Sequence, residues 1–298
     1  MKSIQGKWKG HLCALFCAAV WGTTFVASKR LLGTYTPIQL MFLRFAAAYA
    51  LLWIIYPKWE RPRPREELGC LLMGLTGCTL YFWTENTALT VTYTANVSTI
   101  VALAPLLTAI LAGIVTKGRE RPGRGVWIGF VLAFLGVALV VFNGAFVLKL
   151  NPAGDLLALA TALLWAVYCI QQSYALARRG SLFITRKVMF YGLFTSLPLF
   201  LADREGFSLR PLLAFGPDLF CFLFLAVMGN ALCYLAWAAA ERELGAVTVS
   251  SYIYTIPFVT LVAGAVFLGE PVSAAGVIGA VLIVAGVWAA SRREKAPD

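Results

Sequence analysis

The sequence predicts an all-α integral membrane protein with ten transmembrane helices, arranged as two inverted repeats of five helices. The first observation is composition: the 298 residues are 60% hydrophobic and 13% charged, whereas soluble globular domains carry about 25% charged residues. The second is a set of ten long apolar stretches, and the third is an internal repeat. This composition excludes a water-soluble enzyme, a disordered chain and a small secreted disulfide scaffold.

Ten stretches reach the roughly 20 apolar residues that an α-helix needs to cross a bilayer. In order, the predicted spans are residues 10–31, 37–56, 67–88, 92–116, 124–143, 153–177, 182–202, 217–240, 245–269 and 272–291. Helix breakers separate them, such as Gly118, Pro122 and Gly123 before the fifth span. The first span lacks a small-residue cleavage site and runs on to Lys29 and Arg30, so we expect it to be retained rather than cleaved as a signal peptide.

Positive charge is distributed unevenly between the two sides of these spans. If the amino terminus is inside, 19 of the 25 Lys and Arg residues fall on the inner side, 5 fall on the outer side, and Arg44 lies within the second span. Short loops rich in Lys and Arg stay in the cytoplasm, so both termini are predicted to be cytoplasmic. Because the basic residues sit in short loops, the net charge of +11 indicates a lipid bilayer rather than a nucleic acid as the partner.

The cysteines show no spacing that suggests chemistry. All seven lie in apolar stretches, no CxxC pair occurs, and His11 is the single histidine of the sequence. We therefore interpret the cysteines as small packing residues and expect neither a metal site nor a cofactor.

The chain repeats itself at a shift of about 150 residues. Identical or similar residues align in both halves: Gly77 with Gly229, Phe82 with Tyr234, Ser98 with Ser250, Pro105 with Pro257 and, at a shift of 144, Trp21 with Trp165. The repeat predicts two domains of five spans, residues 1–145 and 146–298. Since five is odd, the second copy enters the membrane from the opposite side. Inverted repeats are typical of secondary transporters, whose substrate site lies near the bilayer midplane between the copies.

These marks together resemble the drug/metabolite transporter superfamily, EamA-type branch, over essentially the whole chain. The matching features are Trp21 and Trp165 in the first span of each copy, Pro105 and Pro257 in the fourth, Glu120 and Glu270 in a short charged turn, and Gly125, Gly129, Gly136, Gly276, Gly279 and Gly286 in the fifth. The resemblance implies ten helices, export of small metabolites, alternating access and location in the plasma (inner) membrane. Arg44 resembles a recurrent arginine of the second span, but the seventh span has no aligned counterpart.

Two ionisable residues lie at membrane depth, where charge is costly and usually faces a cavity or a partner. Arg44 and Glu85 are predicted at comparable depths below the outer surface. One interpretation gives them a shared role: Glu85 accepts a proton or binds an amine, and Arg44 is its counter-ion or anchors a substrate carboxylate. The other is that each extends toward the lipid headgroups or fixes helix packing.

Polar and aromatic residues recur at helical spacing on three spans. A site for a modest organic solute combines aromatic walls with a few hydrogen-bonding groups, and the alternative is an aromatic belt or ordinary helix packing. The candidate substrate-binding residues are Trp21, Arg44, Tyr81, Glu85, Asn86, Asn96, Trp165, Tyr168, Gln172, Asn230, Tyr234, Trp237, Ser251 and Tyr254. Asn96, Ser251 and Tyr254 precede the prolines of their spans, and hydrogen bonds of such polar residues to their own helix remain the alternative role.

Pro105 and Pro257 stand in the middle of the fourth and ninth predicted spans. Proline removes a backbone donor and kinks a helix. Paired interruptions in equivalent spans mark the binding centre or its hinges in transporters. We therefore expect hinges at these two residues.

The sequence favours a secondary transporter that exports small metabolites such as amino acids, with hydrophobic or aromatic ones preferred. Drug-like or cationic compounds are the alternative substrates. No GxxxxGK[ST] motif occurs, which excludes direct use of ATP, and Glu85 makes proton coupling an option. An intramembrane enzyme is disfavoured because no Asp pair or HExxH motif occurs. A receptor or scaffold that does not transport remains the second hypothesis, and the oligomeric state is left open.

Overall fold

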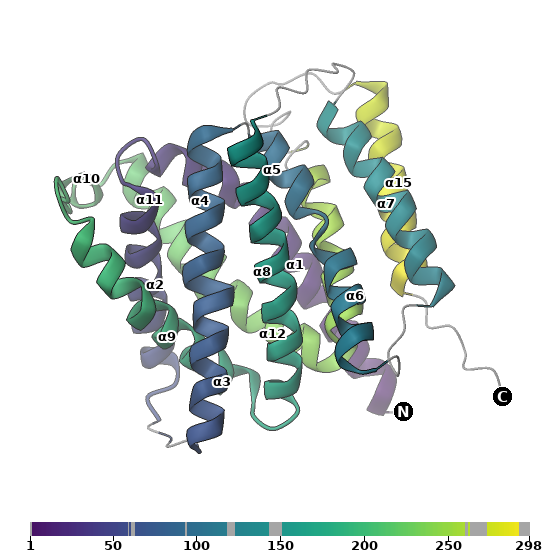
Figure 1. The fold of residues 1–298 in the computed structure, drawn as a ribbon, viewed down its shortest axis with the longest axis horizontal. Coiled ribbons are helices and arrows are strands. Elements are labelled where there is room, and N and C mark those ends of the chain that lie inside the picture. Colours follow the sequence, from purple (N-terminus) through teal and green to yellow (C-terminus); the bar gives the residue numbers. More distant parts are fainter. Residues whose placement is uncertain are drawn as a thin grey trace.

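The computed structural model describes residues 2–58, 60, 63–92, 94–117, 123–142, 151–259, 262 and 273–291. Within these ranges all regular structure is helical and there is no β-strand, which confirms the all-α prediction for this part of the chain. Most helices stand side by side as a bundle, and α7 and α15 form a pair at one edge (Figure 1). Glu120 and Glu270 lie outside the described residues, as does the boundary predicted at 145/146.

The described helices of the first half overlap all five predicted spans, and the fourth predicted span is divided into two helices. Its elements are α1 (Lys2–Leu31), α2 (Pro37–Ile55), α3 (Pro64–Gly74), the π-helical segment η1 (Leu75–Leu80), α4 (Tyr81–Val91), α5 (Thr94–Val101), α6 (Ala104–Val115) and α7 (Arg124–Phe142). The π segment joins α3 and α4 without a break, so helical backbone continues from residue 64 to residue 91.

The second half follows a similar order. Its elements are α8 (Pro152–Leu176), α9 (Ser181–Ala202), the short α10 (Arg210–Leu213), α11 (Pro217–Leu223), the π-helical η2 (Phe224–Leu232), α12 (Cys233–Leu244), α13 (Ala246–Ser250), the 3-10 segment η3 (Ser251–Thr255) and α15 (Ala274–Ser291). Four described helices are long and apolar enough to cross a membrane by length and composition: residues 7–31, 37–55, 152–176 and 217–244.

Two helix starts have a clear local cause. At α2, the Thr36 hydroxyl accepts a hydrogen bond from the Gln39 backbone N–H (3.1 Å), and the Gln39 side chain accepts one from the Thr36 N–H (3.3 Å). This capping box satisfies two backbone donors that a helix start leaves free. At α8, the Asn151 side chain caps the Gly154 N–H (3.2 Å). Pro37 and Pro152 each stand in the first turn, where a missing N–H costs nothing.

The irregular segments recur at equivalent places in the two halves. Moving η1 by the repeat distance of 152 residues places it on residues 227–232, inside η2. The same shift moves the break at residues 102–103, between α5 and α6, onto residues 254–255 at the end of η3. The backbone distortions therefore follow the sequence repeat.

Pro105 stands in the first turn after a break, whereas Pro257 lies within helical backbone that continues from residue 246 to residue 259. Pro105 is in the first turn of α6, and Pro257 follows Ile256, where α-helix resumes after η3. A proline in the first turn neither removes an intrahelical hydrogen bond nor clashes with the preceding turn. The chain therefore changes helix at Pro105, whereas at Pro257 a single helix passes from 3-10 to α geometry.

Helices α7 and α15 pack so closely that backbone meets backbone. A Cβ added at Gly136 would lie 2.5 Å from the Gly279 carbonyl oxygen, and one added at Gly286 would lie 2.6 Å from the Gly129 oxygen. Position 136 therefore faces 279 while 129 faces 286, so the two helices run antiparallel. Small residues allow this approach where lipid provides no hydrophobic drive for helices to associate.

Candidate functional site

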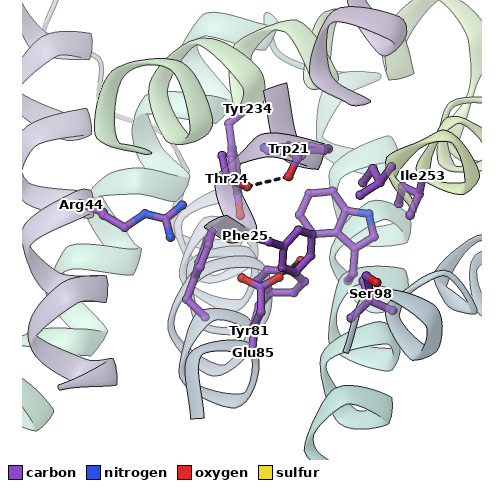
Figure 2. A pocket seen from close by; sticks show the side chains of 13 residues that line it. Trp21, Thr24, Phe25, Arg44, Tyr81, Glu85, Ser98, Tyr234 and Ile253 are labelled. Carbon is purple, nitrogen blue, oxygen red and sulfur yellow. Dashed lines mark hydrogen bonds between the residues drawn. The ribbon is translucent and has the colours of Figure 1, made fainter. Parts of the chain in front are cut away.

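A cavity of about 40 Å³ lies inside the bundle. Residues of both halves of the chain line it: Trp21, Thr24, Phe25, Arg44, Tyr81, Phe82, Glu85, Ser98, Val101, Trp165, Tyr234, Ile253 and Ile256. Figure 2 shows Arg44 entering from α2 at one side and Tyr81 and Glu85 reaching in from α4. The walls are mostly aromatic and aliphatic, with a few polar groups.

Six of the residues predicted for the site line this cavity, namely Trp21, Arg44, Tyr81, Glu85, Trp165 and Tyr234. Among the lining residues absent from the predicted set, Thr24 and Phe25 follow Trp21 by three and four positions and so share its helix face. This spacing could have identified them from the sequence. Val101, Ile253 and Ile256 give no such signal, because aliphatic residues occur on every face of these helices.

The Arg44 guanidinium is buried and is held by another helix. Its Nε and Nη2 both donate to Oδ1 of Asn230 (3.1 and 2.6 Å), and Nη1 donates to Oγ of Ser28 (3.4 Å). Its Cζ also lies 4.5 Å from the centroid of the Phe82 ring, within the range of a cation–π contact. Asn230 does not line the cavity but fixes the direction of the cation that does.

The Glu85 carboxylate faces the same cavity from α4. The Tyr81 hydroxyl, one turn earlier, donates to its Oε1 (2.8 Å). No ion pair joins Arg44 and Glu85 in the structure: the guanidinium contacts Asn230 and Ser28, and the carboxylate contacts Tyr81. A cation and an anion therefore face one cavity without neutralising each other directly.

Five aromatic rings form a cluster at one side of the cavity: Trp21, Trp165, Tyr168, Tyr234 and Trp237. The centroids of Trp21 and Trp165, which align in the sequence repeat, are 5.3 Å apart with the rings at 88°. Trp237 lies 5.0 Å from Trp21 and 5.6 Å from Trp165. These separations fit the favoured edge-to-face and tilted arrangements of aromatic pairs.

Two backbone carbonyls anchor this aromatic cluster from opposite halves. The Trp21 indole N–H donates to the Gly229 oxygen (3.0 Å), and the Tyr234 hydroxyl donates to the Gly77 oxygen (2.6 Å). Gly77 and Gly229 align in the sequence repeat and belong to η1 and η2. Each half of the repeat therefore supplies a glycine carbonyl that holds one aromatic side chain of the other half.

The other predicted residues lie away from the cavity lining. Asn86, Tyr168, Gln172, Asn230 and Trp237 are fully or almost fully buried in the surrounding core. Ser251, Tyr254 and the hinge candidate Pro105 line a separate cavity of about 20 Å³. Pro257 is buried at the start of its helical turn. The side chain of Asn96 lies outside the described part of the structure.

The size of the cavity limits what it can hold in this conformation. A cavity needs roughly 10–15 Å³ to hold one water molecule, so about 40 Å³ has room for a few water molecules. Pockets for drug-sized molecules measure roughly 300–1,000 Å³. An organic solute would therefore enter only after the surrounding helices separate. Among the described residues, no group of three or more His, Cys, Asp or Glu is placed to hold a metal ion.

Comparison with known proteins gives a consistent result over nearly the whole chain. The model of the EamA-like transporter family matches residues 8–142 and again residues 152–292. A protein of Archaeoglobus fulgidus named "Uncharacterized transporter" is 27% identical over 292 residues, covering 96% of this chain and 98% of the relative.

Two further relatives carry more specific names. The "Probable terminal-alkyne amino-acid exporter" of Streptantibioticus cattleyicolor is 27% identical, with coverage of 92% of this chain and 90% of the relative. The "Probable amino-acid metabolite efflux pump" of Escherichia coli is 26% identical, with coverage of 94% of each chain. A solved crystal structure that is 22% identical superposes with a TM-score of 0.73, over 94% of this chain and 96% of the other, and so shares the fold.

Proposed function

The chain belongs to the EamA-like transporter family, and we propose that it is a secondary transporter that exports amino acids or closely related zwitterions. Hydrophobic and aromatic side chains would be preferred, because the cavity walls are largely aromatic and aliphatic. The names of two relatives, an amino-acid exporter and an amino-acid metabolite efflux pump, support this substrate class.

The proposed architecture is ten transmembrane helices in two inverted five-helix repeats, divided near residue 145. Three observations support it: the family model matches twice, the irregular segments recur at the repeat distance, and α7 and α15 run antiparallel. These two helices hold equivalent positions in the copies, and antiparallel partners are what inversion requires. The excess of Lys and Arg on one side favours a plasma-membrane protein with both termini in the cytoplasm.

One observation carries the substrate proposal: Arg44 and Glu85 face a single cavity without forming an ion pair. An amino acid carries one carboxylate and one ammonium group. The guanidinium would bind the carboxylate, since charge-assisted hydrogen bonds to arginine are strong and directional. The Glu85 carboxylate would bind the ammonium group, and the side chain of the substrate would contact the aromatic rings.

The proposed mechanism is alternating access. The cavity is too small for an amino acid in this conformation, so the halves must rock or bend to open it to one side at a time. The break at residues 102–103 and the 3-10 segment η3 interrupt regular α-helix beside the cavity, and we assign the hinges to them, with Pro105 and Pro257 in the α-helical turns that follow. Proton coupling would follow if Glu85 bound a proton after releasing the ammonium group.

Counterflow in proteoliposomes tests the proposal. Vesicles preloaded with phenylalanine are mixed with labelled phenylalanine, phenethylamine (which lacks the carboxylate) or 3-phenylpropanoate (which lacks the amine). We expect accumulation of phenylalanine and little of either analogue. Accumulation of phenethylamine alone would support export of cationic compounds instead. A protein that moves none of a panel of amino acids, amines and sugars would contradict transport of these solutes, and chemical conversion of one would indicate an enzyme.

A further inference from the structure

A groove on the outside of the bundle, remote from the central cavity, joins a basic end to an apolar floor. It runs between α3, the end of α8 and the start of α9 and measures about 380 Å³. Arg65, Arg178 and Arg179 line its basic end, and Leu72, Met73 and Ile184 contribute to its apolar part. An amphipathic ligand with an anionic head matches this distribution.

The basic end of the groove opens into a wider basin. That basin is lined by Arg63, Pro64, Arg65, Glu66, Arg178 and Arg179. Four of these residues also line the groove, so the two hollows adjoin. The lining of the basin thus carries four guanidinium groups and one carboxylate.

The one carboxylate in this lining is already engaged. Glu66 accepts hydrogen bonds from Nη2 of Arg179 (2.8 Å) and from the backbone N–H of Arg63 (3.1 Å). Among the described residues, Arg65 and Arg178 form no ion pair, and both side chains are exposed. These two cations remain available for an anion that approaches along the groove.

The surface around the groove is apolar. Leu68, Leu72 and Tyr174 are 56%, 42% and 55% exposed, as expected where a helix faces lipid. Gly69 lines the groove, and a Cβ added there would meet no atom within 4 Å. Free space therefore extends along α3 from the arginines toward the lipid-facing surface.

We propose that this groove binds an anionic phospholipid of the cytoplasmic leaflet, with its phosphate at Arg65 and Arg178 and an acyl chain along Leu72 and Met73. Assignment to this leaflet rests on the topology given under the proposed function. Basic pockets between helices on the cytoplasmic side are suited to acidic lipid headgroups. A phospholipid fits better than free phosphate, because the groove continues past the arginines into an apolar channel that an acyl chain can occupy.

Binding is measured with purified wild-type protein in a neutral detergent, titrated with dioleoyl phosphatidylglycerol, dioleoyl phosphatidylcholine or glycerol phosphate. We expect saturable binding of phosphatidylglycerol and a rise in melting temperature, with much weaker effects of the other two. Equal binding of the two lipids would overturn the proposal. Binding of glycerol phosphate as tight as that of phosphatidylglycerol would also overturn it, since the apolar groove would then contribute nothing.

Two variants test the two parts of the groove. Arg65→Gln combined with Arg178→Gln is expected to weaken phosphatidylglycerol binding about 30-fold, whereas Arg204→Gln with Arg210→Gln, which removes the same charge from the α9–α11 connection, should leave it unchanged. Gly69→Leu keeps every charge and fills the groove, so it should also weaken binding while the protein stays folded. Wild-type affinity in both groove variants would refute the site.

This result is independent of transport. Lipid binding is read from purified protein without any substrate, while the counterflow assay tests export by the wild-type protein. A protein that binds phosphatidylglycerol at the groove but moves no amino acid would leave the groove assignment standing and contradict the proposed function. A protein that moves amino acids but does not bind phosphatidylglycerol at the groove would support the proposed function and overturn the groove assignment.

Discussion

The two sides of the central aromatic cluster are built on equivalent backbone but filled differently. Thr24 aligns with Tyr168 at the shift of 144 residues, and Glu85 aligns with Trp237 at the shift of 152. Where the first half has the two smaller polar side chains, the cavity is open, and both residues line it. Where the second half has Tyr168 and Trp237, the space is filled: neither residue lines the cavity, and their exposed fractions are 0% and 1%, against 9% for Thr24 and 7% for Glu85.

The space beside the two equivalent glycines, Gly77 and Gly229, differs in the same way. A Cβ added at Gly77 would lie 2.2 Å from the Tyr168 ring, whereas one at the equivalent Gly229 would lie 3.1 Å from the Thr24 methyl group. Each of these contacts joins one half of the chain to the other, and the size of one side chain decides whether space remains. A sequence repeat can therefore supply a nearly symmetric backbone frame, while residue differences at two pairs of equivalent positions leave the cavity on one side of it.

The largest expected effect is a loss of stability when a large side chain is removed from the filled side of the aromatic cluster. Trp237→Ala removes a fully buried indole that contacts Trp21 and Trp165, so we expect a loss of about 3–5 kcal/mol in stability. The melting temperature of the purified protein in detergent measures it. Trp83→Ala, at a position 42% exposed on α4, is the matched control and should change little. Equal losses in the two variants would show that the second side is not tightly filled.

Arg44→Gln tests the charged side of the comparison. The substitution removes the proposed anchor for a substrate carboxylate, so amino-acid counterflow should fall about 100-fold, the equivalent of about 3 kcal/mol. Arg44→Lys keeps the charge but provides a single ammonium group in place of the planar fork, and should retain part of the activity. Unchanged counterflow in Arg44→Gln would remove Arg44 from the binding site.

Substitutions of the glycines where α7 packs against α15 are expected instead to lower stability by similar amounts in the two helices. Gly136→Ala and Gly286→Ala each bring a methyl group within 2.6 Å of opposing backbone, and we expect similar losses of about 1–3 kcal/mol. Gly69→Ala, where the added carbon meets nothing within 4 Å, serves as the control. Thermal unfolding of the three variants gives the measurement. A large loss in only one of Gly136→Ala and Gly286→Ala would break the symmetry inferred for this pair.

Glu85→Gln separates recognition of the amine from that of the carboxylate. Phenylalanine counterflow should fall about tenfold, because the amide has no charge to offer the ammonium group, while the small flux of 3-phenylpropanoate should not decrease. If Glu85 also carries the coupling proton, the pH dependence of transport should disappear in the variant. An unaltered pH profile would remove proton coupling through Glu85.

The smallest effect is expected at the surface pair of Glu66 and Arg179. The hydrogen bond from Arg179, and then that from the Arg63 N–H, hold the pKa of the Glu66 carboxyl below its ordinary value of about 4.5. A folded-state pKa below the unfolded one means that this stabilisation is complete above the ordinary value and is lost as pH falls through the depressed value. Glu66→Gln should therefore flatten the decline in melting temperature on acidification slightly. An identical decline in the variant would contradict this.

The repeat and its marks could be identified from the sequence, because they depend on local composition and spacing. Apolar length predicted helices over ranges such as 37–56 and 153–177, and capping by Thr36 and Asn151 at these helix starts is itself local. Alignment of the two halves also identified Trp21 and Trp165 as candidate site residues, and the structure places their rings in contact. Periodicity within a helix likewise brought Tyr81 and Glu85 to one face, where they form a hydrogen bond.

The packing of the helices sets which polar groups meet across helices and which face the cavity. Arg44 and Asn230 are 186 residues apart and join through a hydrogen bond that no spacing rule indicates. The helices are apolar on several faces, so hydrophobicity did not distinguish cavity-lining Ile253 and Val101 from packed core. The class of protein, the helical ranges and the repeat are predictable from the chain's residues alone, because lipid solvation acts on each segment separately. The position of the cavity follows from packing, since it depends on the sizes of side chains that meet only after the halves associate.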